Sequence, residues 1–225
     1  EAVMTRNEEI AIKWLNHGAN PNAMDEYGNT PMHYAAQSNL KNVVECLLEL
    51  KCDIDCTNTE GETPLITAIE QENEEIAITL LKHGANPNAK DENGNSLMHF
   101  AVKFNLIITV DLLLRLKSEY DGFNKKCKTP LLEAVMGRNQ HLAIKLLRHG
   151  ANPNVKDEYD NYVMHYAVFF NLTIVIHFLH SLKYDLDGFN NNSETLLLEA
   201  VMTRNEEIAI KWLNHGSIPN AMDEY

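Results

Sequence analysis

The chain has 225 residues, of which 44% are hydrophobic, and a net charge of −13. No apolar run approaches the roughly 18 residues of a membrane span, so we expect no membrane insertion. The negative charge disfavours nucleic acid as a partner, because phosphate backbones reward clustered Lys and Arg. Four cysteines that recur with no period indicate no disulfide framework, which favours a reduced, intracellular and cytoplasmic setting.

A seven-residue phrase that reads TPMHYAA in its first copy recurs every 33 residues without insertion. Its copies are Thr30–Ala36, Thr63–Ile69, Ser96–Val102, Thr129–Val135, Tyr162–Val168 and Thr195–Val201. A second phrase, HGANPN, begins at His17, His83 and His149 and returns as HGSIPN at His215. A fixed period of this size predicts a solenoid of stacked supersecondary units, each in contact only with its neighbours.

Residues 58–90 show how one repeat folds. Thr63 followed by Pro64 is typical of an N-cap and a first helical position, and an apolar stripe follows at helical spacing. After a polar interruption, a second helix begins near Glu74 and ends before Gly84, which can adopt the left-handed conformation. A polar loop rich in turn-forming residues completes the repeat. Neither helix can bury its apolar side alone, so the repeats must stack.

This 33-residue helix–turn–helix unit, with TPLH-like openings and HGANPN closings, resembles the ankyrin repeat over the whole chain. The resemblance implies an all-α fold, an ankyrin-repeat α-solenoid with projecting β-hairpin loops, as a single solenoid over 1–225. In the family's usual frame the repeats are 1–24 (partial), 25–57, 58–90, 91–123, 124–156, 157–189, 190–222 and the start of another at 223–225.

Two further regularities lie above the repeat. Every second repeat replaces the helix-ending glycine with Lys51, Lys117 or Lys183, and we expect its second helix to end differently there. Glu1–Gly18 recurs unchanged at Glu199–Gly216. We interpret this as a block duplication in a longer repeat protein, of which the chain is a fragment, and expect the gene to continue with a sequence close to Gly28–Ala36.

Most of the histidines and glycines have structural explanations. The resemblance implies that His33, His99 and His165 bond to neighbouring backbone, and that the threonine before His33 contributes. The histidines of the HGANPN phrases precede helix-ending glycines and suit the C-terminal dipole. Those glycines are Gly18, Gly84, Gly150 and Gly216. The loop residues Asn22, Asn88, Asn154 and Asn220 are interpreted as turn formers.

The sequence contains no pattern that indicates chemistry. It has no nucleophile elbow, glycine-rich phosphate loop or HExxH motif. His177 and His180 share one helix, but no carboxylate at matching spacing completes a zinc site. We therefore predict no enzymatic activity, no cofactor and no metal.

Residues that do not repeat are the candidates for recognition. The resemblance implies that a partner contacts hairpin tips and the ends of the first helices, along a concave groove. At those positions the chain turns apolar towards its C-terminal half. The predicted partner-binding residues are Phe104, Met136, Tyr159, Phe169, Phe170 and Met202. Exposed aromatic residues and methionines are typical of interaction hot spots, and the alternative is that some pack between repeats.

Three functions remain open. The first is a non-enzymatic scaffold that binds another protein in the groove, with an apolar centre and an acidic surround that favours a partner with basic or neutral edges. The second is a structural, elastic segment of a giant repeat array that can stack end to end, since neither end has a polar capping repeat. The third is an ankyrin targeting segment of a larger enzyme or channel.

Overall fold

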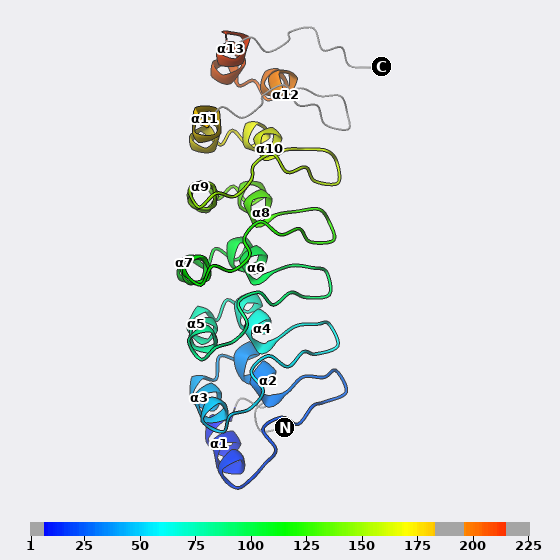
Figure 1. Ribbon diagram of the computed structural model, residues 1–225, viewed down its shortest axis with the longest axis vertical. Helices are drawn as coiled ribbons and strands as arrows, with labels where there is room; N and C mark the ends of the chain where they lie inside the picture. The colour runs from blue at the N-terminus through cyan, green and yellow to red at the C-terminus, as the bar shows by residue number, and fades with distance from the viewer. Residues whose placement is uncertain (1–6, 183–195, 215–225) are drawn as a thin grey trace. The chain divides into compact units, whose positions relative to one another are not determined.

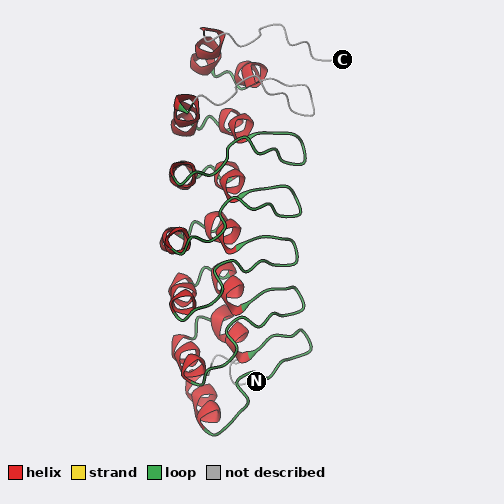
Figure 2. Ribbon diagram, viewed as in Figure 1, coloured by secondary structure: helices red, strands yellow, loops and turns green. Residues whose placement is uncertain are grey.

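The computed structural model describes residues 7–182 and 196–214 of the chain. The chain divides into two compact units, an N-terminal unit of residues 1–119 and a C-terminal unit of residues 120–225. Within the described ranges the backbone forms short helices joined by loops and no extended strand (Figures 1 and 2). The predicted all-α fold is confirmed, while its continuity as one solenoid over 1–225 stays a prediction.

The described part of the N-terminal unit holds one second helix followed by three helix pairs. Its helices are α1 (Glu8–Asn16), α2 (Pro31–Gln37), α3 (Lys41–Glu49), α4 (Pro64–Glu70), α5 (Glu74–Lys82), α6 (Leu97–Lys103) and α7 (Ile107–Arg115). The first helix of a pair has seven residues and the second has nine. First helices pack in the order α2, α4, α6, and α1 packs against α3 as α5 does against α7. The first helices lie between the second helices and the projecting loops (Figure 1).

The C-terminal unit repeats this arrangement. Its helices are α8 (Pro130–Met136), α9 (Gln140–Arg148), α10 (Val163–Phe169), α11 (Thr173–Ser181), α12 (Leu196–Met202) and α13 (Glu206–Asn214). The first helices α8, α10 and α12 pack in that order, and α9 packs against α11. Four residues with roles predicted from the sequence lie outside the described residues: Lys183, His215, Gly216 and Asn220.

The apolar stripes of the sequence form the core of each unit. In the N-terminal unit the second position of every first helix is fully buried, as Met32, Leu65 and Met98 are. In the second helices the seventh position is fully buried, at Leu47, Leu80 and Leu113. Each fully buried side chain of this size contributes roughly 1.5–3 kcal/mol. Because adjacent repeats supply both sides of each contact, the core is continuous within a unit.

The first helices begin as the sequence predicts. The Thr63 hydroxyl oxygen accepts a hydrogen bond from the Ile66 amide at 3.3 Å, and the Thr129 hydroxyl oxygen accepts one from the Leu132 amide at 3.2 Å. These bonds satisfy amides that have no partner within the helix. Proline at the first helical position of α4 and α8 costs nothing, because the missing N–H would have been unpaired there.

Some second helices are capped by the preceding repeat. Helices α7 and α11 follow Leu106 and Leu172, whose side chains cannot accept a hydrogen bond. Instead the Thr109 amide donates to Glu74 Oε1 of α5 at 2.9 Å. In the C-terminal unit the Ile174 amide donates to Gln140 Oε1 of α9 at 3.1 Å. The cap that one repeat lacks is therefore supplied by its neighbour, which ties the two repeats together.

The expectation that lysine would end a second helix differently from glycine is wrong for Lys51 and Lys117. Both adopt a left-handed conformation with φ of 55°, where Gly84 has φ of 92°. The Lys51 amide donates to the Leu48 carbonyl at 3.0 Å, as the Gly84 amide donates to the Leu81 carbonyl at 3.2 Å. Keeping this bond offsets a left-handed penalty of roughly 1–2 kcal/mol for a residue with a Cβ.

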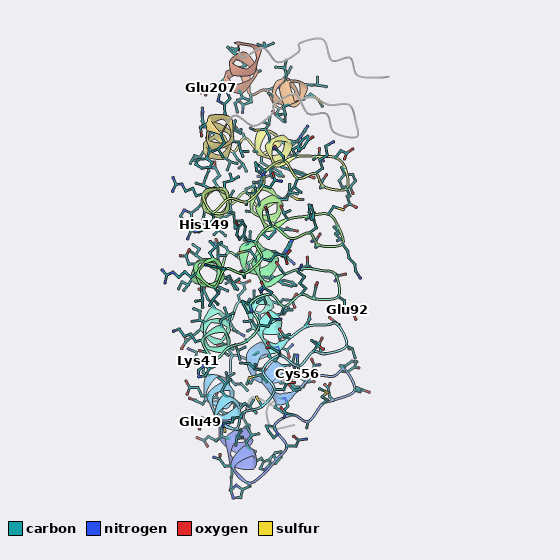
Figure 3. All side chains as sticks on the ribbon, viewed as in Figure 1. Lys41, Glu49, Cys56, Glu92, His149 and Glu207 are labelled. Carbon is teal, nitrogen blue, oxygen red and sulfur yellow. The ribbon has the colours of Figure 1, made fainter. Side chains whose placement is uncertain are left out.

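The loops turn back on themselves as hairpins but form almost no ladder. A single β-bridge, between Lys90 and Ser96, occurs in the described ranges. At four of the described bends an Asp or Asn side chain accepts from the amides two and four residues on, as Asp157 does from Tyr159 and Asn161, at 2.9 Å each. These bonds from side chain to backbone within one loop take the place of backbone hydrogen bonds between paired strands. Neighbouring bends also bond, and the amide of Glu92, labelled on its loop in Figure 3, donates to the Glu60 carbonyl at 3.2 Å.

Further hydrogen bonds join the segments that follow successive second helices. In the N-terminal unit the Asp53 amide donates to Asn22 Oδ1 at 3.0 Å, and the Glu119 amide donates to Asn88 Oδ1 at 2.8 Å. Asn22 and Asn88 were interpreted as turn formers within one repeat. The structure shows that they also link consecutive repeats, a role that a single repeat cannot reveal.

Candidate functional site

Each first helix buries one side and turns the other side outward. In α10 five of the seven residues are buried. Tyr166, Phe169 and Phe170 instead follow the i, i+3, i+4 spacing of a single outward stripe. We call the corresponding stripe of α8, α10 and α12 the C-terminal first-helix face, and that of α2, α4 and α6 the N-terminal first-helix face. All of the predicted partner-binding residues except Tyr159 lie on one of these two faces.

The C-terminal first-helix face exposes large apolar side chains. Phe169 is 58% exposed and Met202 is 65% exposed, while Met136 and Phe170 are half-buried. Tyr159, on the adjoining loop, is 59% exposed. Exposed apolar area of this kind contributes little to folding, because the hydrophobic effect rewards only area removed from water. The surrounding residues that the structure describes do not cover these side chains, so they are available for contact with another molecule.

Aromatic rings and an arginine form a cluster at the end of α10. The rings of Phe169 and Phe170 meet edge to face with centroids 5.0 Å apart, and those of Tyr166 and Phe170 stack at 6.3 Å. The Arg138 guanidinium carbon lies 4.6 Å from the centroid of the Phe170 ring. Arg138 follows α8, so this contact joins consecutive repeats. Sequence reasoning missed Arg138, and only its position one residue after a predicted helix end could have pointed to it.

A buried hydrogen bond fixes the loop of Tyr159 against the same helix. The Tyr166 hydroxyl donates to Asp157 Oδ2 at 2.5 Å, and Asp157 is buried. Burial, together with this bond to a carboxylate, raises the pKa of Tyr166. The hydroxyl therefore stays protonated as a donor. The bend of the loop is held next to α10, which places the loop at the border of the face.

The N-terminal first-helix face is different in character. Phe104 is half-buried, and Lys103 Nζ lies 4.9 Å from its ring centroid. Phe100, one turn earlier in α6, is buried with 4% exposure. On α4 the stripe carries Glu70, whose pKa is raised to about 7 by burial and by the nearby carboxylate of Glu62. This face therefore carries a glutamate at the helix position where its counterpart carries Phe169.

Three histidines lie inside the first helices. The Thr30 amide donates to His33 Nδ1 at 3.1 Å, so Nδ1 accepts and the proton sits on Nε2, which donates to the Glu62 carbonyl of the next repeat at 2.9 Å. Burial lowers the pKa of His33, which favours this neutral form. The amides of Ser96 and Tyr162 likewise donate to Nδ1 of His99 and His165, at 3.1 Å each. Tyr162 lacks the short hydroxyl side chain that Thr30 and Ser96 have at this position. Its ring instead stacks on His165, with centroids 5.6 Å apart.

The second set of histidines caps the ends of second helices. Nδ1 of His17, His83 and His149 lies 2.7, 2.9 and 2.9 Å from the carbonyl oxygen four residues earlier. A carbonyl can only accept, so these rings carry the proton on Nδ1, the opposite tautomer to His33. The glycines that follow, Gly18, Gly84 and Gly150, have φ between 89° and 96°, the left-handed region that glycine adopts without strain.

The described residues contain no group of three His, Cys, Asp or Glu side chains that could hold a metal ion. All four cysteines are free thiols. Burial raises the pKa of Cys52 to about 11 and also raises those of Cys46 and Cys56, so these thiols stay protonated and weakly nucleophilic. None of the helices that the structure describes is long and apolar enough to cross a membrane.

A stack of short helix pairs with projecting loops and a variable outward face defines a repeat protein of the helical solenoid class. Family models for ankyrin repeats match residues 1–91 and 127–158. The chain belongs to the ankyrin-repeat family, as the sequence resemblance predicts. Ankyrin repeats are generally protein–protein interaction modules and generally non-enzymatic.

Curated relatives share part of the chain. It is 32% identical over 124 residues to neurogenic locus notch homolog protein 1 of Danio rerio, covering 55% of this chain and 5% of that protein. It is 26% identical over 151 residues to the putative ankyrin repeat protein L371 of Acanthamoeba polyphaga mimivirus, covering 67% of this chain and 20% of that protein. The chain thus spans a small part of the length of these relatives.

Two solved structures share the fold. The human ASB11 ankyrin repeat domain matches with a TM-score of 0.79 and 22% identity, covering 97% of each chain. The ankyrin repeat domain of Bcl-3, described as a unique member of the IkappaB protein family, matches with a TM-score of 0.74 and 24% identity, covering 88% of this chain and 91% of that one. At these identities the likeness establishes the fold alone.

Proposed function

We propose that the chain is a non-enzymatic scaffold that binds another protein on the C-terminal first-helix face. The observation that carries this proposal is the exposure of Phe169 and Met202 on neighbouring first helices that pack against each other. Isolated exposed apolar residues are common on protein surfaces, but adjoining ones on one face are typical of interaction sites. Phe104 belongs to the N-terminal unit, and we propose for it a contribution to that unit's own face.

The cluster has the features of a binding hot spot. Phe170 is held by Tyr166 on one helix and by Arg138 from the preceding repeat, so its ring is already ordered before any partner arrives. Ordered aromatic side chains lose little conformational entropy on binding, which makes their contacts favourable. Phe169 is free to contribute its exposed ring area, and Tyr159 adds a second aromatic group at the border of the face.

The test uses a binding partner captured from lysate of the source cells and then purified. Replacing an exposed hot-spot residue costs about 2 kcal/mol or more, a loss of affinity of roughly thirtyfold. We expect Phe169→Ser and Met202→Ser each to weaken binding of the purified partner by at least that factor in calorimetry. The matched control is Ile174→Ser, since Ile174 is equally exposed but lies on the second helix α11.

A purified partner whose affinity is unchanged by both first-helix variants, or is lowered equally by Ile174→Ser, would remove the proposal. Thermal unfolding of every variant must be recorded beside binding. Exposed positions are expected to change stability by no more than about 0.5 kcal/mol, so a large loss would mean that the substitution disturbed the fold instead.

A further inference from the structure

The positive charges beside the phenylalanine cluster lack acidic partners. Arg138 and Arg204 occupy the same position in the turns after α8 and α12, with φ of 56° and 57°, and both are exposed. In the part of the chain that the structure describes, neither forms an ion pair with a carboxylate. Between them lies the turn after α10, which is joined to the next turn by a bond from Asn205 Nδ2 to Asn171 Oδ1 at 2.7 Å.

Three carboxylates on and beside this face have partners. Glu133 on α8 lies 3.9 Å from Lys128 Nζ, and Asp160 lies 3.7 Å from Lys156 Nζ. Asp157 is buried and accepts the Tyr166 hydroxyl. These three carboxylates therefore already have partners, whereas Arg138 and Arg204 are not paired with a carboxylate in the described residues.

Arg138 is held in place next to the cluster. Its guanidinium carbon lies 4.6 Å from the centroid of the Phe170 ring, a cation–π contact that positions the side chain. The N–H groups of a guanidinium form a fork of donors whose geometry matches a carboxylate in a bidentate pair. A carboxylate that binds there would place adjoining apolar side chains over Phe169 and Phe170.

We propose that the C-terminal first-helix face binds a protein segment that carries Asp or Glu next to large apolar residues, with Arg138 and Arg204 receiving the carboxylates and Phe169 receiving the apolar groups. The inference rests on the proposed binding function of this face and specifies its partner. It reverses the expectation from the sequence, which surrounded the apolar centre with acidic residues. That expectation was based on the overall charge of −13, which is a property of the whole chain and not of this face.

The N-terminal unit provides the contrast that makes this assignment specific. Glu72 holds the position equivalent to Arg138 and Arg204, with φ of 57°. It therefore shows that a glutamate is accommodated in this left-handed turn. The charge-reversal variant Arg138→Glu, Arg204→Glu is consequently expected to keep the fold.

The experiment selects random peptides displayed on phage against the unaltered chain, against Phe169→Ser and against the charge-reversal variant. Arg148→Glu is the matched control. Its guanidinium carbon also lies over a phenylalanine, 5.9 Å from the centroid of the Phe178 ring, but on the second-helix side. We expect peptides that bind the unaltered chain to combine Asp or Glu with Leu, Ile, Phe or Trp, and to lose at least about tenfold in affinity with Phe169→Ser.

The charge-reversal variant should lose these peptides and select Lys or Arg in their place, while Arg148→Glu should retain the original preference. Selected peptides that depend on Phe169 but carry no acidic residue, or carry basic ones, would overturn this inference and leave the proposed function standing. If no selected peptide depends on Phe169, both fall.

Discussion

Helix α4 of the N-terminal unit ends at Glu70 and is followed by Gln71 and Glu72. Helix α10 of the C-terminal unit ends at Phe169 and is followed by Phe170. The two helices have the same length and the same place in the repeat, and both pack between neighbouring first helices. At the same outward position α4 carries a glutamate and α10 a phenylalanine, with arginines in the turns beside α10. The outward residues are therefore not set by the requirements of the helix stack.

The inward positions show the opposite behaviour. Every first helix has a fully or almost fully buried alanine at its fifth position, where adjacent helices come close together. These residues are Ala35, Ala68, Ala101, Ala134, Ala167 and Ala200. A larger side chain there would overpack the core and cost about 1–3 kcal/mol. The helix stack therefore restricts the residues on the inward side of each first helix and leaves those on the outward side free to vary.

The largest expected effect separates two phenylalanines on equivalent helices. Phe100 of α6 is 4% exposed, and Phe100→Ala should lower the free energy of unfolding of its unit by about 3–5 kcal/mol through lost burial and a cavity. Phe169 of α10 is 58% exposed, and Phe169→Ala should cost no more than about 0.5 kcal/mol. Urea unfolding followed by circular dichroism measures both.

Phe100→Leu is the control for volume. It removes less apolar volume than Phe100→Ala does, so it should lower the free energy of unfolding by less. If Phe169→Ala proved as costly as Phe100→Ala, Phe169 would be part of the core, and the contrast between a buried N-terminal aromatic and an exposed C-terminal one would disappear.

A smaller effect concerns the bond between helix and loop. Tyr166→Phe removes the hydroxyl that donates to buried Asp157 and should cost about 1.5–3 kcal/mol, the range for hydrogen bonds to charged groups. In the N-terminal unit, α6 carries Phe100 at this position, and Asp91 Oδ2 instead accepts from Asn95 Nδ2 at 2.8 Å. Thermal and urea unfolding of Tyr166→Phe give the measurement.

The reverse substitution tests the same bond in the N-terminal unit. Phe100→Tyr supplies a hydroxyl where α6 has none, and it should raise the free energy of unfolding only slightly, because Asp91 already has a donor. If Tyr166→Phe were neutral, the loop of Tyr159 would be held by its backbone bonds alone, and its place beside α10 would not depend on the tyrosine.

The sequence alone predicts the helix pairs because the signals for them are local. Thr63, Pro64 and Gly84 specify the start of a first helix and the end of a second helix within one repeat. It does not predict Lys51 in a left-handed conformation, because propensity argues for glycine there and the compensating bonds are visible only in the folded helix end. Likewise the cap that Glu74 provides for α7 joins residues 35 positions apart.

The candidate site is less predictable for the same reason. The spacing of residues identifies Phe104, Phe169 and Phe170 as helix-end positions, but their exposure depends on what neighbouring repeats place beside them. The structure makes Phe169 exposed and leaves Phe104 and Phe170 half-buried. The contact of Arg138 with Phe170 spans nearly one full repeat, and no pattern within a single repeat indicates it.

The smallest expected effect tests the acidic character of the N-terminal face through pH. Burial and the nearby Glu62 raise the pKa of Glu70 to about 7, from an ordinary value of 4.5. Between these two values the folded state binds more protons at Glu70 than the unfolded state does. Stability should therefore rise as the pH falls from about 8 to 5, and Glu70→Gln should remove this contribution. Because Glu70 is half-exposed, solvent screening keeps the effect small.

His33 acts in the opposite direction and must be separated from Glu70. Burial lowers its pKa from 6.5, so the unfolded state binds more protons and stability falls as the pH drops through that value. Since His33 is unchanged in Glu70→Gln, the difference between the two unfolding curves against pH isolates the glutamate. A difference that stays constant from pH 8 to 5 would mean that Glu70 titrates normally. The N-terminal face would then carry an ordinary surface carboxylate at Glu70.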